Sequence, residues 1–443
     1  MTLHAGHRRY VLAAIAAVAA VASTCLAFVG QSGASQKSAA ITIWVDAPRV
    51  AAVKAFEKAY PNIPVDINVN NDLPGSDDLE EKFALFNQAG SGWPDALFFP
   101  DNDDIAWASG SKINYTANLS HLVSQQWLSG YSKAAIAPCI VGGKLVCLRN
   151  DTAPVVFWYN ATLFKQWGYT PPKTWPQYEA LSLEIAKDHP GYYTGLAGDA
   201  YAPDRYLWSS GCPTNDVISS TTVRIDTSAS DCTRARNMLS TLLAAKVVSP
   251  EGIFDSSAAT TVGPKLVMTP GAVWYGIYLF QQTFKTPAGE MTATAPLKWP
   301  GDKTTYTGDE GGGFWGVSDH ISGQALANTM TFMKFVVSAD NPAWMAAGGR
   351  GFPAYGPLQG PWLAKVHKLN YFVDFPQLAK AFKKATTEVR PGHSWLLYDT
   401  GTIWGQVVTP AITAGQSLNS IWSAFSSQLV DTAKSVGYNV DTQ

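Results

Sequence analysis

Segments that favour strands alternate with segments that favour helices along most of this chain, and that order restricts the fold more than any other feature. ITIWV at 41–45 is a short β-rich run, and apolar residues from Val50 to Tyr60 then recur at the spacing of one helical face. IPVDINV, DDLEEKFALFNQAGSG and DALFF continue the order as strand, helix and strand. This alternation is typical of βαβ units with a mainly parallel sheet. It resumes beyond residue 150, which predicts two α/β units with a cleft between their facing strand ends.

Composition and charge limit the partners that the chain can bind. The chain has 443 residues, more than one typical domain, with 12% aromatic and 15% charged residues, as in a folded globular protein. The net charge is −2, and the longest basic features are pairs such as Lys383-Lys384. Because binding to phosphate backbones depends on clustered Lys and Arg, we expect no nucleic-acid partner.

The first 40 residues have the pattern of an exported protein. A short basic segment precedes an apolar run over 11–22, which predicts a secretory signal peptide at 1–27. The small polar residues that follow predict a flexible leader at 28–40. Two interpretations of Cys25 stay open: a lipid anchor attached to this cysteine, or a cysteine lost with the signal peptide. In both cases we expect the mature protein at the extracellular face of the cell membrane.

Four further cysteines follow the signal segment, and an oxidising environment outside the cytosol favours their pairing. Cys139 and Cys147 flank IVGGKLV, in which two glycines predict a hairpin turn that brings the arms together. We favour the disulfides Cys139–Cys147 and Cys212–Cys232, although four cysteines allow three connectivities. Buried free thiols are the alternative.

The sequence contains no catalytic motif. HExxH, GxSxG and P-loop patterns are absent, and GGGFWG at 311–316 precedes a strand-like run instead of opening a helix, which indicates a turn and not a dinucleotide site. We therefore expect no enzyme activity, no cofactor and no structural metal.

The acidic run DNDD at 101–104 follows the strand-like DALFF, at the edge of the sheet where α/β proteins bind ligands. It lacks the spacing of a calcium loop. Asn102 and Asp103, together with Asp101, are candidates to accept hydrogen bonds from ligand hydroxyl groups. A solvated loop without a ligand is the alternative.

The most specific pattern in the chain lies at 141–181, VGGKLVCLRNDTAPVVFWYNATLFKQWGYTPPKTWPQYEAL. It combines a Gly-Lys turn, a strand, a Tyr-Asn pair that opens a short helix, and Pro-Pro-x-Thr-Trp before a longer helix. This pattern resembles the extracellular solute-binding proteins of ATP-driven (ABC) sugar importers, of the maltose-binding type. ITIWV, PDALFF, GGGFWGVS and a Gly-rich segment that ends at Pro353 stand in that family's order, so the resemblance covers nearly the whole exported chain.

The resemblance implies the two-lobed periplasmic-binding-protein fold (type II), in which two α/β domains are joined by a multi-segment hinge and enclose a ligand cleft. On this basis we expect an N-terminal lobe at 41–150 and 296–348, and a C-terminal lobe at 151–295 and 349–443. We expect the chain to cross between the lobes near 149–153, 294–299 and 347–353.

The resemblance also implies ligand contacts. A sugar needs aromatic rings against its C–H faces and polar groups at its hydroxyls. The positions that match the family's rings and polar contacts are Trp274, Trp404, Tyr201, Asp46, Arg49 and Asp151. We expect Trp44 and Trp315 to be core residues.

We therefore expect the substrate-binding component of an ABC transporter, a monomer that binds a carbohydrate, with an oligosaccharide favoured, and delivers it to permease subunits in the membrane. Two alternatives stay open. The same fold can bind a glycerophosphodiester or a polyamine, and Arg49 and Arg350 would suit a phosphate. A secreted glycoside hydrolase would need two carboxylates flanking the scissile bond.

Overall fold

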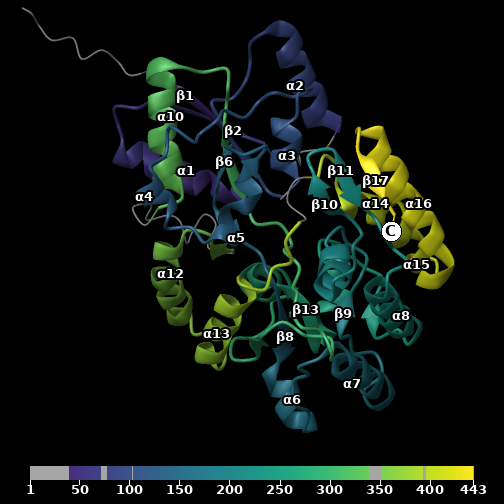
Figure 1. Cartoon of the computed structure of the whole chain (residues 1–443). Coiled ribbons are helices and arrows are strands. Elements are labelled where there is room, and N and C mark those ends of the chain that lie inside the picture. The colour runs from purple at the N-terminus through teal and green to yellow at the C-terminus, as the bar shows by residue number, and fades with distance from the viewer. Residues whose placement is uncertain (1–38, 71–76, 102, 339–350, 393–395, 443) are drawn as a thin grey trace, which may run out of the picture. The chain divides into compact units, whose positions relative to one another are not determined.

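The computed structural model describes residues 39–70, 77–101, 103–338, 351–392 and 396–442 (Figure 1). The predicted signal peptide with Cys25, most of the predicted leader, Asn102 and Arg350 lie outside these described residues. Within the described ranges, no helix is long and apolar enough to cross a membrane.

A five-stranded sheet gathers strands from distant parts of the chain in the order β2-β1-β3-β15-β6. The strands are β1 (Ile41–Val45), β2 (Val65–Val69), β3 (Ala96–Phe99), β6 (Cys147–Arg149) and β15 (Phe314–Val317). β1 pairs in parallel with β2 and β3, as the βαβ pattern predicts. β15 runs antiparallel to both β3 and β6, so the complete sheet is mixed.

Six of the described helices from the first 340 residues accompany this sheet. They are α1 (Val50–Ala59), α2 (Asp77–Ala89), α3 (Asp104–Ser109) and α10 (Gly323–Val336), with the short α4 (Gln125–Leu128) and α5 (Lys133–Ile136). α1 and α10 lie side by side (Figure 1). The Phe56 ring of α1 contacts the Phe332 ring of α10, with a centroid distance of 5.3 Å. Trp315 is buried in this core and Trp44 is half-buried against Phe86, which agrees with the structural role expected for both.

The second large group of strands is built differently from the prediction. β8 (Val155–Asn160) is the centre of a sheet with β13 (Met268–Ala272) and β14 (Met291–Thr294), and both neighbours run antiparallel to it. Parallel pairing is confined here to short strands: β9 (Gly195–Leu196) with β12 (Val248–Ser249), and the segment 222–224 with 439–441. The expectation of a mainly parallel sheet is therefore wrong in this part, because strand order in the sequence does not determine strand direction.

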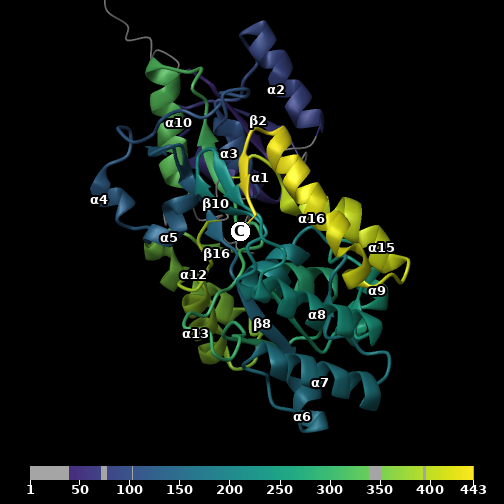
Figure 2. The same ribbon diagram turned by 45° about the vertical axis from the view of Figure 1, so that its right-hand side comes forward.

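Several helices and small sheets complete this second group. The helices are α6 (Ala161–Trp167), α7 (Trp175–Asp188), α8 (Ser230–Ala244), α9 (Ala258–Thr261), α12 (Gly356–Lys368), α13 (Phe375–Ala385), α14 (Thr400–Ile403), α15 (Thr409–Thr413) and α16 (Leu418–Ser435), with π-helices at Pro203–Leu207, Gly276–Thr283 and Trp404–Val408. The remaining sheet joins β10 (Asp216–Ser219), β11 (Thr222–Arg224) and β17 (Asn439–Asp441). Figure 2 shows α16, in yellow, beside α15, and α16 also contacts α14.

The segment from 155 to 175 folds as its sequence indicates. Asn160 ends β8 and caps α6, since its side chain accepts a hydrogen bond from the Leu163 N–H at 3.0 Å. Gly168 ends α6 in the left-handed conformation, with φ of 76°. Thr174 then caps α7 by accepting from the Gln177 N–H at 3.3 Å. The two prolines at 171–172 separate the helices because proline cannot continue either of them.

Both favoured disulfides are present. Cys139 and Cys147 flank the hairpin of β4 (Ile140–Val141) and β5 (Lys144–Leu145), whose two turn glycines have positive φ. The Cys212–Cys232 disulfide links the segment that follows a 3-10 helix at Trp208–Ser210 to the first turn of α8.

Two of the predicted lobe crossings meet in space. β7 (Asp151–Thr152) pairs antiparallel with β16 (Phe352–Pro353). The third predicted crossing begins where β14 ends, and the chain then proceeds to β15 in the five-stranded sheet. The boundaries of the two lobes stay a prediction.

Candidate functional site

A cavity of about 300 Å³ opens beside the ends of β1 and β3. It is lined by Asp46, Pro48, Arg49, Pro100, Asp151, Tyr201, Phe254, Trp274, Tyr278, Glu310, Gly312 and Gly351. These residues come from both of the predicted lobes. Five of the eight residues predicted to bind ligand therefore share one cavity.

Four aromatic rings form one wall of the cavity. Trp274 follows β13 and is half-buried, and its ring centroid lies 6.0 Å from those of both Tyr201 and Phe254. The planes of Trp274 and Phe254 differ by only 13°. Tyr278 completes the wall, 5.7 Å from Trp274. Phe254 is 55% exposed, so its ring is accessible to a molecule that enters the cavity.

Asp46 and Arg49 provide polar groups immediately after β1. They form an ion pair across a 3-10 turn that begins at Ala47. The second carboxylate oxygen of Asp46 and the Nε of Arg49 are buried without a hydrogen-bond partner among the described residues. One acceptor and one donor therefore remain for a ligand. The guanidinium also lies 3.9 Å above the Phe98 ring, which restricts its position.

Asp151 is a buried carboxylate at the start of β7. Its Oδ1 accepts hydrogen bonds from the Asn150 side chain at 2.7 Å and from the Gly313 N–H at 3.1 Å, and lies 4.0 Å from Arg49 Nη2. Burial raises the pKa of Asp151, and the nearby Arg49 charge opposes that shift. A side chain at Gly351 would collide with Asp151, since a Cβ there would lie 1.7 Å from Oδ2.

Tyr201 connects the aromatic wall to the segment after β3. Its hydroxyl donates a hydrogen bond to Asp101 Oδ1 at 2.9 Å. Burial, and then the Asp101 charge, raise the pKa of Tyr201 well above its usual range. This bond joins residues that belong to different predicted lobes.

A buried charge network lies behind the wall. Arg205 is fully buried and pairs with Asp199 at 2.9 Å and with Glu310 at 3.2 Å, while the Tyr275 hydroxyl donates to Glu310 at 2.8 Å. Burial raises the pKa of Glu310 to about 7, although Arg205 lowers it. The indole N–H of Trp274 donates to the backbone oxygen of Glu310 at 2.9 Å. The network thus helps to fix the orientation of the Trp274 ring.

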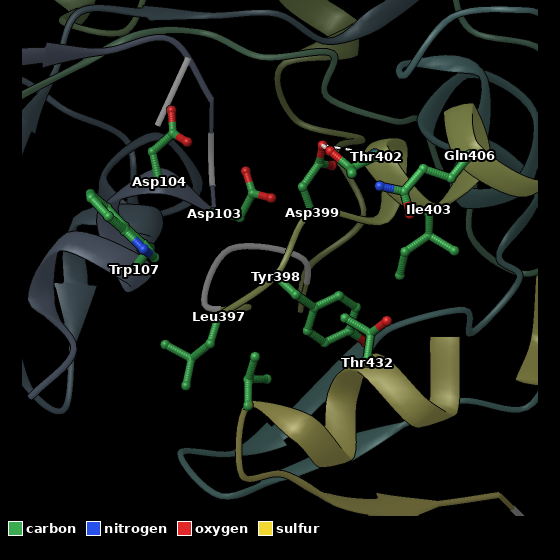
Figure 3. Close-up of a pocket in the computed structure, with 11 residues that line it drawn as sticks. Asp103, Asp104, Trp107, Leu397, Tyr398, Asp399, Thr402, Ile403, Gln406 and Thr432 are labelled. Atoms are coloured by element: carbon green, nitrogen blue, oxygen red, sulfur yellow. Dashed lines mark hydrogen bonds between the residues drawn. The ribbon is translucent and has the colours of Figure 1, made fainter. Parts of the chain in front are cut away.

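Asp103 lies in a different pocket, of about 270 Å³. Figure 3 shows that Asp103 and Asp104 come from one side of this pocket and Asp399 and Thr402 from the other. Burial, and then the neighbouring carboxylates, raise the pKa of Asp104 well above its usual range. Asp103 thus lines this pocket and not the cavity around Trp274, and its contact with a ligand stays a prediction. Asn102 lies outside the described residues.

Trp404 is a core residue in this structure. It is 0% exposed, its indole N–H donates to the Ala197 backbone oxygen at 2.9 Å, and its ring packs against Phe425 at 5.4 Å. It does not line the cavity. In this structure the ring offers no exposed face to a ligand, and the predicted ligand contact of Trp404 stays a prediction.

Sequence reasoning missed Phe254, Tyr278 and Glu310. Tyr278 is four residues after Trp274, and this spacing places two side chains on the same face of a helix. It could have predicted that Tyr278 lies beside Trp274. Phe254 lies in a turn between β12 and α9, where no periodicity marks an aromatic residue as functional. Among the described residues, no group of three or more His, Cys, Asp or Glu is placed to hold a metal ion.

Comparison with known proteins places this fold in a class. The galacto-N-biose-/lacto-N-biose I-binding protein of an ABC transporter from Bifidobacterium longum matches with a TM-score of 0.73 and 20% identity, over 91% of this chain and 99% of that chain. An ABC transporter associated binding protein from B. animalis subsp. lactis Bl-04 matches with 0.72 and 19%, over 91% and 99%. The cyclic alpha-maltosyl-1,6-maltose binding protein from Arthrobacter globiformis matches with 0.65 and 16%, over 89% and 99%. The chain has the two-lobed fold of periplasmic solute-binding proteins.

A sequence model of a protein family shows to which family the chain belongs. The model of the bacterial extracellular solute-binding proteins matches residues 45–343. This chain belongs to that family. No curated protein matches the chain.

Proposed function

We propose that this protein binds a carbohydrate in the cavity beside β1 and β3, and delivers it to the permease of an ABC importer. The observation that carries the proposal is the composition of the cavity. An aromatic wall around Trp274 suits the C–H faces of a sugar, while Asp46 and Arg49 retain an unused acceptor and donor for its hydroxyls.

The size of the cavity favours a short oligosaccharide. Its volume of about 300 Å³ is at the lower end of the roughly 300–1,000 Å³ typical of ligand pockets. The names of three structurally similar proteins include β-1,6-galactobiose, lacto-N-biose and a cyclic maltosyl-maltose as ligands. We therefore propose a disaccharide or a ligand slightly larger.

Binding without catalysis is the better interpretation of the carboxylates. A glycoside hydrolase needs a protonated acid that faces the ligand. Glu310 has the raised pKa of such an acid, but its side chain is fully buried and both oxygens are engaged by Arg205 and Tyr275. Asp46 forms an ion pair with Arg49, so one of its carboxylate oxygens is already engaged.

We place the protein at the extracellular face of the cell membrane, as a monomer that docks on permease subunits. The export pattern at 1–27 supports this location. Lipid attachment at Cys25 is part of the same proposal, and mass spectrometry of the protein from its native membrane would detect the acyl chains.

A ligand screen tests the function. Thermal unfolding is measured with galactose- and glucose-containing di- and trisaccharides, with glycerophosphocholine and with spermidine, followed by calorimetry of each hit. A ligand present at 100 times its Kd adds about 2.7 kcal/mol to the free energy of unfolding, so we expect Tm to rise with a saccharide. A rise only with the phosphodiester or the amine would refute a carbohydrate ligand, and shortened saccharides after incubation would refute binding without catalysis.

A further inference from the structure

Another cavity, of about 690 Å³, lies between the Pro-Pro segment before α7, the end of β14 and α13. Its lining residues are Tyr159, Thr170, Pro171, Pro172, Lys173, Thr294, Ala295, Pro296, Lys298, Thr305, Gln377, Lys380, Ala381 and Lys384. It shares no residue with the cavity around Trp274. We refer to it as the basic groove.

Four lysines and no carboxylate line the basic groove. One backbone hydrogen bond joins two of these lysines, since the Lys298 N–H donates to the Lys173 backbone oxygen at 3.3 Å. Lys380 and Lys384 are one turn apart on α13, an arrangement of like charges that destabilises a helix. Lys384 lies 3.5 Å from Glu388, whereas no carboxylate among the described residues pairs with the other three lysines. Three of the four positive charges in the groove therefore have no carboxylate partner among the described residues.

Neutral donors accompany the lysines. The Tyr159 hydroxyl accepts a hydrogen bond from the Gln377 amide at 3.3 Å, which leaves the hydroxyl hydrogen for another acceptor. The hydroxyl of Thr294 is buried without a hydrogen-bond partner among the described residues. A buried donor without a partner costs free energy unless a ligand or water satisfies it. Both groups would donate to a ligand rich in acceptor oxygens.

We propose that the basic groove binds a phosphorylated molecule that is larger than a single phosphate ion. Phosphate carries more negative charge and more acceptor oxygens than a carboxylate, which suits four ammonium groups with hydroxyl donors beside them. The volume of the groove greatly exceeds that of one phosphate ion, so the ligand carries several phosphates or a phosphorylated organic part. The source is a soluble phosphorylated compound or the headgroup of an anionic lipid.

Calorimetry with tripolyphosphate tests the proposal on the wild type and two double variants. Lys380→Gln/Lys384→Gln removes two charges from the groove. Lys365→Gln/Lys383→Gln removes two exposed charges from α12 and α13 that do not line it. We expect saturable binding by the wild type, at least tenfold weaker binding by the groove variant, and less than a twofold change in the control.

A third variant and a second probe complete the test. Thr294→Val leaves the net charge unchanged and should weaken binding severalfold, which also covers the case in which the lysine variant fails to fold. Sedimentation with phosphatidylglycerol vesicles identifies the source, because retention on vesicles without binding of soluble tripolyphosphate indicates a lipid headgroup. Binding to neither probe, or equal weakening in both double variants, would overturn the proposal.

Discussion

Asp46 and Arg49 show how single residues prepare a binding site before the ligand arrives. Their mutual ion pair uses one oxygen and one nitrogen, while the second Asp46 oxygen and the Arg49 Nε stay buried without partners among the described residues. Each unsatisfied buried group costs about 1–3 kcal/mol. A ligand hydroxyl that bonds to both groups would recover this free energy, so the site is less stable without a ligand than with one.

Glu310 makes stability depend on pH. Its pKa is raised from 4.5 to about 7 by burial, so the proton favours the folded state. The free energy of unfolding should therefore fall, by on the order of 1–3 kcal/mol, as the pH rises from about 4.5 to 7. Glu310→Gln should flatten this slope, as measured by urea unfolding at pH 5, 6, 7 and 8. The exposed Glu184→Gln serves as control, and a Glu310→Gln variant with the wild-type slope would show that Glu310 is not responsible.

The sequence could predict some of the residues that line the cavity, but not which aromatic rings are buried in the core. Asp46 and Trp274 were predicted because their positions match ligand contacts in the family that the sequence resembles, and Asp46 also directly follows the first strand. Trp404 and Trp274 are chemically equivalent rings in apolar surroundings, and only tertiary packing buries the first in the core and half-exposes the second. No pattern in the sequence separates these two outcomes.

At the scale of elements, caps and turns were readable but strand directions were not. Thr174 caps the start of α7 and Gly168 ends α6, and both do so through contacts with residues a few positions away. The antiparallel arrangement of β13 and β14 on β8 depends on pairs more than 100 residues apart in the chain. Such pairing is a property of the folded sheet, so the predicted parallel order failed there.

The Cys212–Cys232 disulfide is an element-level constraint with a measurable effect. The bond joins two cysteines that are 20 residues apart, one before α8 and one within it. Closing a loop of this length lowers the entropy of the unfolded chain, which stabilises the folded state by about 3 kcal/mol. We expect Cys212→Ser/Cys232→Ser to lower the free energy of unfolding by about that amount in urea titrations. An unchanged midpoint with an unchanged m-value would contradict this. Wild type under reducing conditions provides a second comparison.

At the scale of the whole molecule, the fold brings together three distant parts of the sequence. β1 to β3, β6 and β15 form one sheet, although β15 begins more than 200 residues after β3 ends. The order of strands and helices predicted an α/β protein, and the resemblance at 141–181 predicted the two lobes. The lobe boundaries themselves stay a prediction. Ligand binding in such a fold stabilises whichever lobe arrangement makes more contacts with the ligand.

The central claim is that a saccharide binds against Trp274, and calorimetry on matched tryptophan variants tests it most directly. The most stabilising saccharide from the screen is titrated into the wild type, Trp274→Ala and Trp167→Ala, where Trp167 is an equally half-buried ring that stacks on His189 outside the cavity. We predict a loss of about 2 kcal/mol or more, roughly 30-fold in Kd, for Trp274→Ala, and less than twofold for Trp167→Ala. Equal affinity of wild type and Trp274→Ala would contradict the claim.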